Sequence, residues 1–333
     1  MKVRQTLLAL LVGLSSAYWS LAAMSIDKPD YVLYQFPNIP SLGTLETRVG
    51  SLGGGPLGRI ASRRHVVASA IGTVKIPMSE NQGIYFTPGP GLTVHPELLD
   101  SISPANIEGF FFSFTSTGDS EDDIADKLVA RISHLKNLRS LKLGRCDVSD
   151  IGAKGIHDLP QLKLLDMSFS LISRQSVPIL GKLAGLEDVI LNSVDLSQSD
   201  FSSFGRLPNL STLFLRGSKV SDAMVSSLRP CKNLQYLDLS NNHDVTDASL
   251  AALALLPKLK TVALSGTAVN IGSLTKLARI ERVVVSRRDL KGAKLQELRK
   301  AMPNLVLDMD SKVDPSKNKL DSEELHLFAP TRY

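Results

Sequence analysis

One apolar pattern recurs along the middle of the chain at a nearly constant interval. It has the form Leu-x-x-Leu-x-Leu, followed by a small polar residue or Cys and then by a further apolar residue. The spacing between successive copies is 24 residues four times, then 25, then 21. The seven copies begin at Leu138, Leu162, Leu186, Leu210, Leu234, Leu259 and Ile280. No single unit of this kind buries its own apolar face, so the pattern predicts a stack of repeats.

Each copy carries the signals of a strand, a turn and a helix. In Leu141-Lys142-Leu143, apolar residues alternate with a polar one, as a half-buried strand requires. In most copies, the strand is followed by a residue whose side chain can form a hydrogen bond with the backbone of the turn. Two copies have Val194 and Arg288 at this position instead, and we expect the turns of those two copies to be less regular. Good helix N-cap residues come next, at Ser149, Ser173, Ser197, Ser221, Thr246 and Asn270.

These motifs resemble the leucine-rich-repeat family. A Val precedes each of the pairs Ser221-Asp222 and Thr246-Asp247. This arrangement resembles the class of leucine-rich repeats that are about 24 residues long, which is found in cysteine-containing repeats and in exported bacterial proteins, notably of planctomycetes. The resemblance implies an α/β solenoid shaped as a horseshoe, with a parallel sheet on its concave side and helices on its convex side. It also implies a binding module without enzymatic activity, and it leaves the partner open.

The remaining segments are assigned from composition. Residues 1–22 are expected to be a signal peptide cleaved after Ala22, because Lys2 and Arg4 precede an apolar stretch; the alternative is a retained membrane anchor. Residues 23–71, rich in Gly and Pro, are expected to be a partly disordered linker. Residues 72–106 are expected to form an N-terminal cap with a pair of strands, residues 107–309 the solenoid, and residues 310–333 a polar, disordered tail.

Composition argues against several kinds of chemistry. The net charge of +5 is small and no basic stripe is interleaved with aromatic residues, so we expect no nucleic-acid partner. The six histidines share no ligand spacing, and we expect no metal, cofactor or catalytic site. Cys146 and Cys231 are three to four repeats apart, or about 15 Å at the strand spacing. A disulfide needs Cα atoms within about 7 Å, so we expect two unpaired, buried thiols.

The strand pattern predicts which side chains face the concave side. Residues that alternate with the core positions point away from the core. We expect an exposed patch of apolar anchors ringed by charges, which is typical of an interface. Its members are Leu164, Asp166, Asp188, Ile190, Phe214, Arg216, Tyr236 and Asp238. The alternatives are that these are scattered exposed apolar residues without a function, or that the N-terminal segment covers them.

The hypothesis from sequence is therefore an exported protein of the periplasm, cell envelope or extracellular space. It recognises a protein, or a surface glycan, through its concave face. It contacts a membrane only through residues 1–22, if these are retained. The alternatives are a substrate-selecting adaptor of the ubiquitin-ligase type and a structural component of the cell envelope.

Overall fold

The computed structural model describes residues 31–48, 64–77, 83–103, 107–112, 123–286, 300–303 and 305–307. The predicted signal peptide and the predicted polar tail lie outside these ranges. Within them, no helix is both long enough and apolar enough to cross a membrane.

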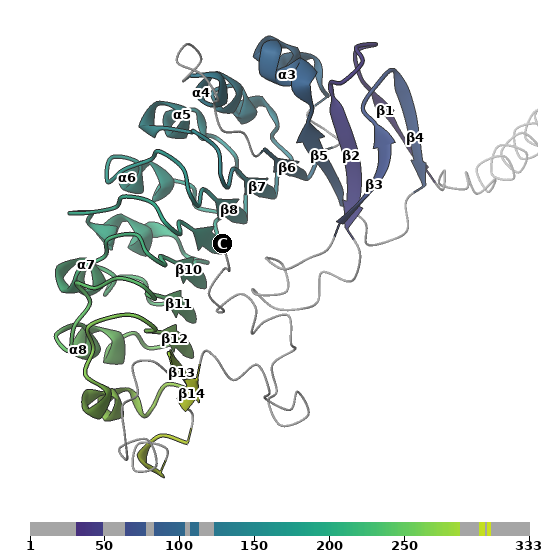
Figure 1. The fold of residues 1–333 in the computed structure, drawn as a ribbon. Helices are drawn as coiled ribbons and strands as arrows, with labels where there is room; N and C mark the ends of the chain where they lie inside the picture. Colours follow the sequence, from purple (N-terminus) through teal and green to yellow (C-terminus); the bar gives the residue numbers. More distant parts are fainter. Residues whose placement is uncertain are drawn as a thin grey trace, which may run out of the picture.

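Short parallel strands stack in sequence order along the inner side of a horseshoe (Figure 1). Equivalent positions of the repeats pair across them, as in Leu165 with Val189, and Leu213 with Leu237. The predicted register and fold class are confirmed. The sheet also includes a strand at Phe110, upstream of the first predicted copy, and a last strand at Leu305–Leu307. The strands are β6 (Gly109–Phe111), β7 (Ser140–Lys142), β8 (Leu164–Asp166), β9 (Asp188–Ile190), β10 (Thr212–Phe214), β11 (Tyr236–Asp238), β12 (Thr261–Ala263), β13 (Arg282–Val285) and β14 (Leu305–Leu307).

Short helices return the chain along the convex side (Figure 1). The α-helices are α3 (Pro90–Val94), α4 (Ile124–Val129), α5 (Asp150–Gly155), α6 (Val177–Leu180), α7 (Asp222–Ser227) and α8 (Ser249–Ala254). The 3-10 helices are η1 (Pro96–Ser101), η2 (Ile132–His134), η3 (Phe201–Arg206) and η4 (Ile271–Leu277). Leu and Val side chains pack between these helices and the sheet in one continuous core.

The predicted N-caps are confirmed at some helices and wrong at others. The Ser149 hydroxyl accepts from the N–H of Ile151 at 3.1 Å, and the Asn270 amide oxygen accepts from Gly272 at 2.9 Å. Ser197 is not the cap of its repeat, because η3 begins later and Asp200 caps it by accepting from Ser202 at 2.8 Å. The Ser221 side chain makes no capping bond.

The N-terminal part differs from the sequence interpretation. Its described residues form β1 (Tyr31–Gln35), β2 (Gly43–Arg48), β3 (Arg64–Ser69), β4 (Thr73–Pro77) and β5 (Ile84–Pro88). The linker interpretation is wrong for β1, β2 and β3. The two strands of the expected cap pair do not pair with each other, since β4 pairs with β1, and β5 lies between β2 and β6. β2 and β3 thus extend the main sheet by antiparallel pairing.

Aromatic packing explains why strands form in this Gly- and Pro-rich sequence. The ring of Phe36 stacks on that of Phe86 with centroids 6.2 Å apart, and Phe86 in turn lies 5.8 Å from Phe110 of the first repeat. Gly43 allows β2 to approach β5, since a Cβ there would lie 2.5 Å from the carbonyl oxygen of Thr87. The apolar end of the repeat stack is thereby covered, as solenoids require.

Two smaller predictions have different outcomes. Cys146 and Cys231 are both buried and form no disulfide, as predicted, and burial raises the pKa of Cys231 to about 12. The turn at Val194 is not irregular. Ser193 has a φ of 54°, close to the 57° of Phe169 at the same place one repeat earlier. The N–H of Val194 donates to the Ser218 hydroxyl of the next repeat at 3.4 Å. The Ser218 side chain thus provides the hydrogen bond to the turn that Val194, with its apolar side chain, cannot form. Arg288 lies outside the described residues.

Candidate functional site

All eight predicted patch residues lie on, or directly after, four adjacent strands. Across the sheet, Leu164 pairs with Asp188, and Ile190 pairs with both Asp166 and Phe214. Tyr236 pairs with Thr212, and Phe214 also pairs with Asp238. Arg216 follows β10 by two residues. The parallel register therefore brings the predicted residues into neighbouring rows on one face of β8 to β11.

This face carries an apolar cluster that is separate from the main core. Its buried members are Ile190, Phe214, Ala263 and Val284, and Tyr236 packs against them. Successive side chains of a strand point to opposite faces, so Leu213 belongs to the core and Phe214 to the concave cluster. Ala263 and Val284 were not among the predicted site residues. They occupy the repeat position of Ile190 and Phe214, so the register was the signal that identifies them.

The exposure predicted for the patch is wrong for five of its eight residues, whereas Asp166, Arg216 and Tyr236 are partly exposed. The exposed fraction is 2% for Phe214, 4% for Ile190 and 3% for Leu164. Asp188 and Asp238 are equally buried, at 0% and 1%. The alternation of the strand sequence does place these side chains away from the core. It carries no information about what lies above them.

The charged groups of the patch are partnered. The Arg216 guanidinium donates from Nε to Oδ2 of Asp238 at 3.2 Å, and both side chains are largely removed from water. The other carboxylate oxygen of Asp238 accepts from the N–H of Ser240 at 2.8 Å. Asp166 accepts in the same way from Ser168 at 2.9 Å. These aspartates therefore fix the chain where each strand ends, besides contributing negative charge to the face.

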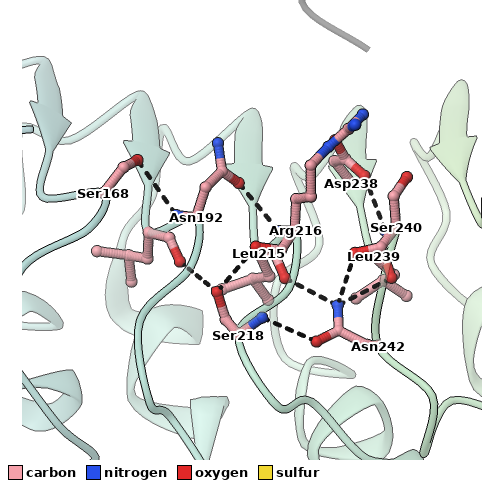
Figure 2. A network of polar contacts seen from close by, with 10 residues as sticks. Ser168, Asn192, Leu215, Arg216, Ser218, Asp238, Leu239, Ser240 and Asn242 are labelled. Atoms are coloured by element: carbon pink, nitrogen blue, oxygen red, sulfur yellow. Dashed lines mark hydrogen bonds and ion pairs between the residues drawn. The ribbon is translucent and has the colours of Figure 1, made fainter. Parts of the chain in front are cut away.

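A ladder of polar side chains lies next to the patch, in the turns after the strands (Figure 2). The Asn192 amide oxygen accepts from the backbone N–H of Arg216 at 2.9 Å and so positions that residue. Asn242 donates to the carbonyls of Leu215 and Leu239 at 2.8 Å, and accepts from the N–H of Ser218 at 3.0 Å. Buried turn backbone is thereby satisfied between repeats. The ladder therefore holds the turns after β9 to β11, including the backbone of Arg216.

The patch offers binding rather than bond-making chemistry. Among the described residues, no group of three or more His, Cys, Asp or Glu side chains is placed to hold a metal ion. The apolar side chains of the cluster have no reactive group, and its Arg–Asp pair is a closed ion pair. Such a surface can exclude water and select a complementary shape and charge.

Two segments of the chain match the model of a known repeat family. Residues 134–156 and 231–254 match the family described as "Leucine Rich repeat". Together with the register of the stacked strands, this match shows that the chain is a leucine-rich-repeat protein.

Individual relatives resemble only part of the chain. Tubulin-specific chaperone E of Bos taurus is 27% identical over 175 residues, which cover 44% of this chain and 33% of that protein. A putative adenylate cyclase regulatory protein of Trypanosoma equiperdum is 31% identical over 134 residues, covering 40% and 20%. The solved structure of internalin C2 from Listeria monocytogenes is 19% identical with a TM-score of 0.41, covering 65% of this chain and 90% of that one. The chain thus spans a third or less of either curated relative.

Proposed function

We propose that this protein is a non-enzymatic module that binds another protein through its concave face. The observation that carries the proposal is the second apolar cluster, formed by Ile190, Phe214, Ala263 and Val284, on the face opposite the core. A solenoid needs only one core to fold, so a second cluster on its inner surface calls for a separate reason. The centre of a protein interface provides one, because it combines apolar anchors with desolvated charges.

A protein partner fits this surface better than a glycan does. Aliphatic side chains such as Ile190 and Val284 offer no hydrogen bonds to sugar hydroxyl groups, whereas they match the apolar side chains of a peptide. The names of the two curated relatives, a chaperone specific for tubulin and a regulator of adenylate cyclase, describe proteins that act on other proteins. A surface glycan remains the alternative ligand.

The proposal places the protein outside the cytoplasm, in the periplasm, cell envelope or extracellular space. The support is the sequence of residues 1–22, with its two basic residues and apolar stretch. An adaptor of the ubiquitin-ligase type would instead remain in the cytosol, and a structural envelope component would lack a specific partner. Mass spectrometry of the protein isolated from its own organism tests export: cleavage after Ala22 supports it, and an intact chain in the cytosol contradicts it.

The binding site is tested by substitutions at the two aromatic positions. Tyr236→Ala removes a half-buried ring at the edge of the cluster, and Phe214→Ala removes its centre. Leu255→Ser is the matched control, because it replaces a 61% exposed apolar residue just after α8. Each variant is used for affinity capture from extracts of the protein's own organism, with quantitative mass spectrometry and a thermal melt.

Loss of the same captured protein from both aromatic variants, but not from the control, supports the concave site. The Tyr236→Ala variant must keep the melt of the parent protein, which separates lost binding from lost folding. Undiminished capture by both aromatic variants would rule out the concave face as the binding site.

A further inference from the structure

Charge is divided unevenly between the two lateral sides of the solenoid. Strands β8 to β13 are parallel, so every passage from a helix to the next strand lies on one side, and every passage from a strand to a helix lies on the other. We call the first the return side; it comprises the last turns of α6, η3, α7, α8 and η4 with the residues that lead to the next strand. It carries eight basic residues: Lys182, Arg206, Arg229, Lys232, Lys258, Lys260, Lys276 and Arg279. The acidic residues of these segments are Glu187 and Glu281.

The opposite side has the reverse balance over the same repeats. The passages from β8, β9, β10, β11 and β12 to the following helices carry more aspartates than basic residues. The charged residues there are Asp195, Asp200, Asp222, Asp244, Asp247, Arg174, Arg216 and Lys219. The small net charge of the whole chain hides this division, because it averages over both sides. The return side is therefore a positive surface.

All eight basic side chains of the return side are exposed to solvent. Within the described ranges, no ion pair joins any of them to a carboxylate. Two of them have a task in the fold. Lys258 donates to Oδ1 of Asn233 at 2.6 Å, and Arg279 donates to the carbonyl of Leu256 at 3.0 Å. The positive charge of this side is thus available to an outside partner.

Helix dipoles account for only part of this charge. Basic groups are favoured near the negative end of a helix, but the effect fades within the last turn. Arg206 and Lys276 lie in such turns, in η3 and η4. Lys232 and Lys260 lie more than a full turn beyond the ends of α7 and α8. The stability of the helices gives no reason for the charge of these two residues.

A large apolar residue is exposed among the basic groups. Leu255 follows α8 directly and is 61% exposed. Lys258 comes three residues later, and Lys276 occupies the place of Leu255 in the next repeat. A bilayer surface suits this combination, because anionic headgroups attract the basic groups while an apolar side chain enters the boundary of the acyl chains. A nucleic-acid backbone would match the charges alone, and the described segments of the return side contain no aromatic residue that could stack on bases.

The shape of the return side also suits a bilayer. The strands and helices follow one arc, with the strands inside and the helices outside (Figure 1). The two sides that flank this arc are therefore flat, unlike the concave and convex faces. Basic groups recur at five successive returns from helix to strand, so they spread along the flat side. A planar array of positive groups matches a planar layer of negative headgroups.

We propose that the return side is a docking surface for a membrane that contains anionic lipids. The basic residues contact the headgroups, and Leu255 enters the interface. In this orientation the concave face stands at right angles to the bilayer, so a protein partner can approach it from the side. The inference goes beyond the proposed function and does not rest on it, because the return side and the concave cluster share no residue. It also widens the expectation from sequence, which limited membrane contact to residues 1–22.

Sedimentation with vesicles tests the docking surface. The full chain is mixed with vesicles of phosphatidylcholine alone, or of phosphatidylcholine and anionic phosphatidylglycerol in equal parts. One variant combines Arg206→Gln, Arg229→Gln and Lys232→Gln. A basic residue close to an anionic surface contributes about fivefold in affinity, so this variant should lose about 100-fold of the preference for the anionic vesicles. Residues 1–22 are present in every chain, and the comparison of the two lipid compositions removes their contribution.

A matched control removes the same charge from the opposite side. Arg145, Arg174 and Lys219 are exposed, and all three are changed to Gln. Because salt screens charges that do not contact the surface, this variant should keep its preference to within about tenfold. Thermal melts check that both variants are folded. An equal loss in the two variants would overturn the proposal, as would a parent chain that does not prefer anionic vesicles, or one that prefers duplex DNA to them.

A fluorescent probe reports which side meets the bilayer. Both native thiols are buried, so a fluorophore that responds to polarity can be attached selectively to Leu255→Cys or to Leu171→Cys. Leu171 is the matched control, since it is 62% exposed and lies between β8 and α6, on the opposite side. We expect the emission at position 255 to rise severalfold on anionic vesicles and the emission at position 171 to stay unchanged. An equal response at both positions, or none at position 255, would contradict the proposed orientation.

The vesicle experiments use the chain without any protein partner. A failed capture experiment with successful docking would therefore contradict the proposed function and leave the membrane surface intact. The reverse result would contradict the membrane surface and leave the concave binding site intact.

Discussion

Two kinds of repeat occur along the convex side, and they differ in the residue that follows the turn from strand to helix. In one kind an aspartate follows the residue that ends the strand-to-helix turn. Asp222 accepts from the backbone N–H of Thr246 at 2.8 Å and from its hydroxyl at 2.6 Å, and the Ser249 hydroxyl also donates to it. Asp150 accepts from Ser173 and Ser176 of the next repeat in the same way. Each carboxylate thus clamps one repeat to the next.

The repeats between these two lack the clamp. Arg174 and Gln198 occupy the equivalent positions, and one bond of 2.6 Å between their exposed side chains joins them. The helices change with the residue. α5 and α7, which begin at the aspartates, are six-residue α-helices, whereas α6 has four residues and η3 is a 3-10 helix. A carboxylate in the first turn stabilises the positive end of an α-helix, and Arg and Gln do not.

The difference shows that one repeat fold tolerates two ways of holding its convex side. It also has a place in the molecule. β8 and β9, which supply Leu164, Asp188 and Ile190 of the concave patch, belong to the repeats without a clamp. β10, with Phe214, belongs to the repeat clamped by Asp222. The patch therefore spans the boundary between the two kinds of repeat.

The largest effect is expected from Asp222→Ala. It removes three hydrogen bonds and leaves the N–H of Thr246 without its acceptor, which should lower the free energy of unfolding by about 2 to 3 kcal/mol. Gln198→Ala is the matched control, and we expect it to change stability by about 0.5 kcal/mol or less, as is usual for exposed side chains. Urea unfolding followed by circular dichroism measures both. Equal losses in the two variants would show that the carboxylate does not act as a clamp.

Acid should weaken the clamped repeats next. Burial raises the pKa of Asp222, but hydrogen bonds from Ser249 and Thr246 outweigh it, so the pKa lies below its ordinary value; Asp150 behaves alike with Ser173 and Ser176. A lowered folded-state pKa contributes stability that is present above the unfolded value, about 3.9, and is lost as the pH falls through the folded value. The melting temperature should therefore fall below about pH 4.

Comparison with a variant isolates the contribution of one carboxylate. Asp222→Asn has no titrating group at the clamp, so its melting temperature should start lower at neutral pH and fall less on acidification. Calorimetric melts at a series of pH values measure both curves. Parallel curves for the parent and the variant would assign the acid sensitivity to other groups.

How far the sequence predicts this molecule depends on whether a feature repeats. The register and the concave placement of Phe214 follow from a period that is visible in the sequence, because alternation fixes the face of each residue. The burial of Phe214 does not follow from this alternation, which sets the face of a side chain but not its exposure. The strands around Phe36 and Phe86 occur only once, so no second copy marks them within a Gly-rich composition.

The aspartate clamp could be predicted from the sequence only in part. The aspartates directly follow the predicted N-cap residues Ser149, Ser221 and Thr246. The sequence also places Asp150 23 residues before Ser173, and Asp222 24 residues before Thr246. The bonds between repeats were missed because helix capping is a local concept, whereas each carboxylate here serves the following repeat. Only stacked repeats bring residues 23 positions apart into hydrogen-bond contact.

The smallest effect on stability is expected when an aspartate is introduced into a repeat that lacks the clamp. Gln198 precedes Ser221 by 23 residues, as Asp150 precedes Ser173, and the Ser221 side chain makes no capping bond. Gln198 has a φ of 61°, which Asp tolerates better than most residues do. We therefore expect Gln198→Asp to raise the free energy of unfolding by about 1 kcal/mol through new bonds to Ser221. Gln198→Asn introduces a side chain of the same shape as Asp without the charge, and its gain in stability should be smaller.

Arg174 could pair with the new carboxylate instead, so the Gln198→Asp change is also made in an Arg174→Gln background. A gain that disappears in that background would reflect a surface ion pair, worth about 0.5 kcal/mol, and not a clamp between repeats.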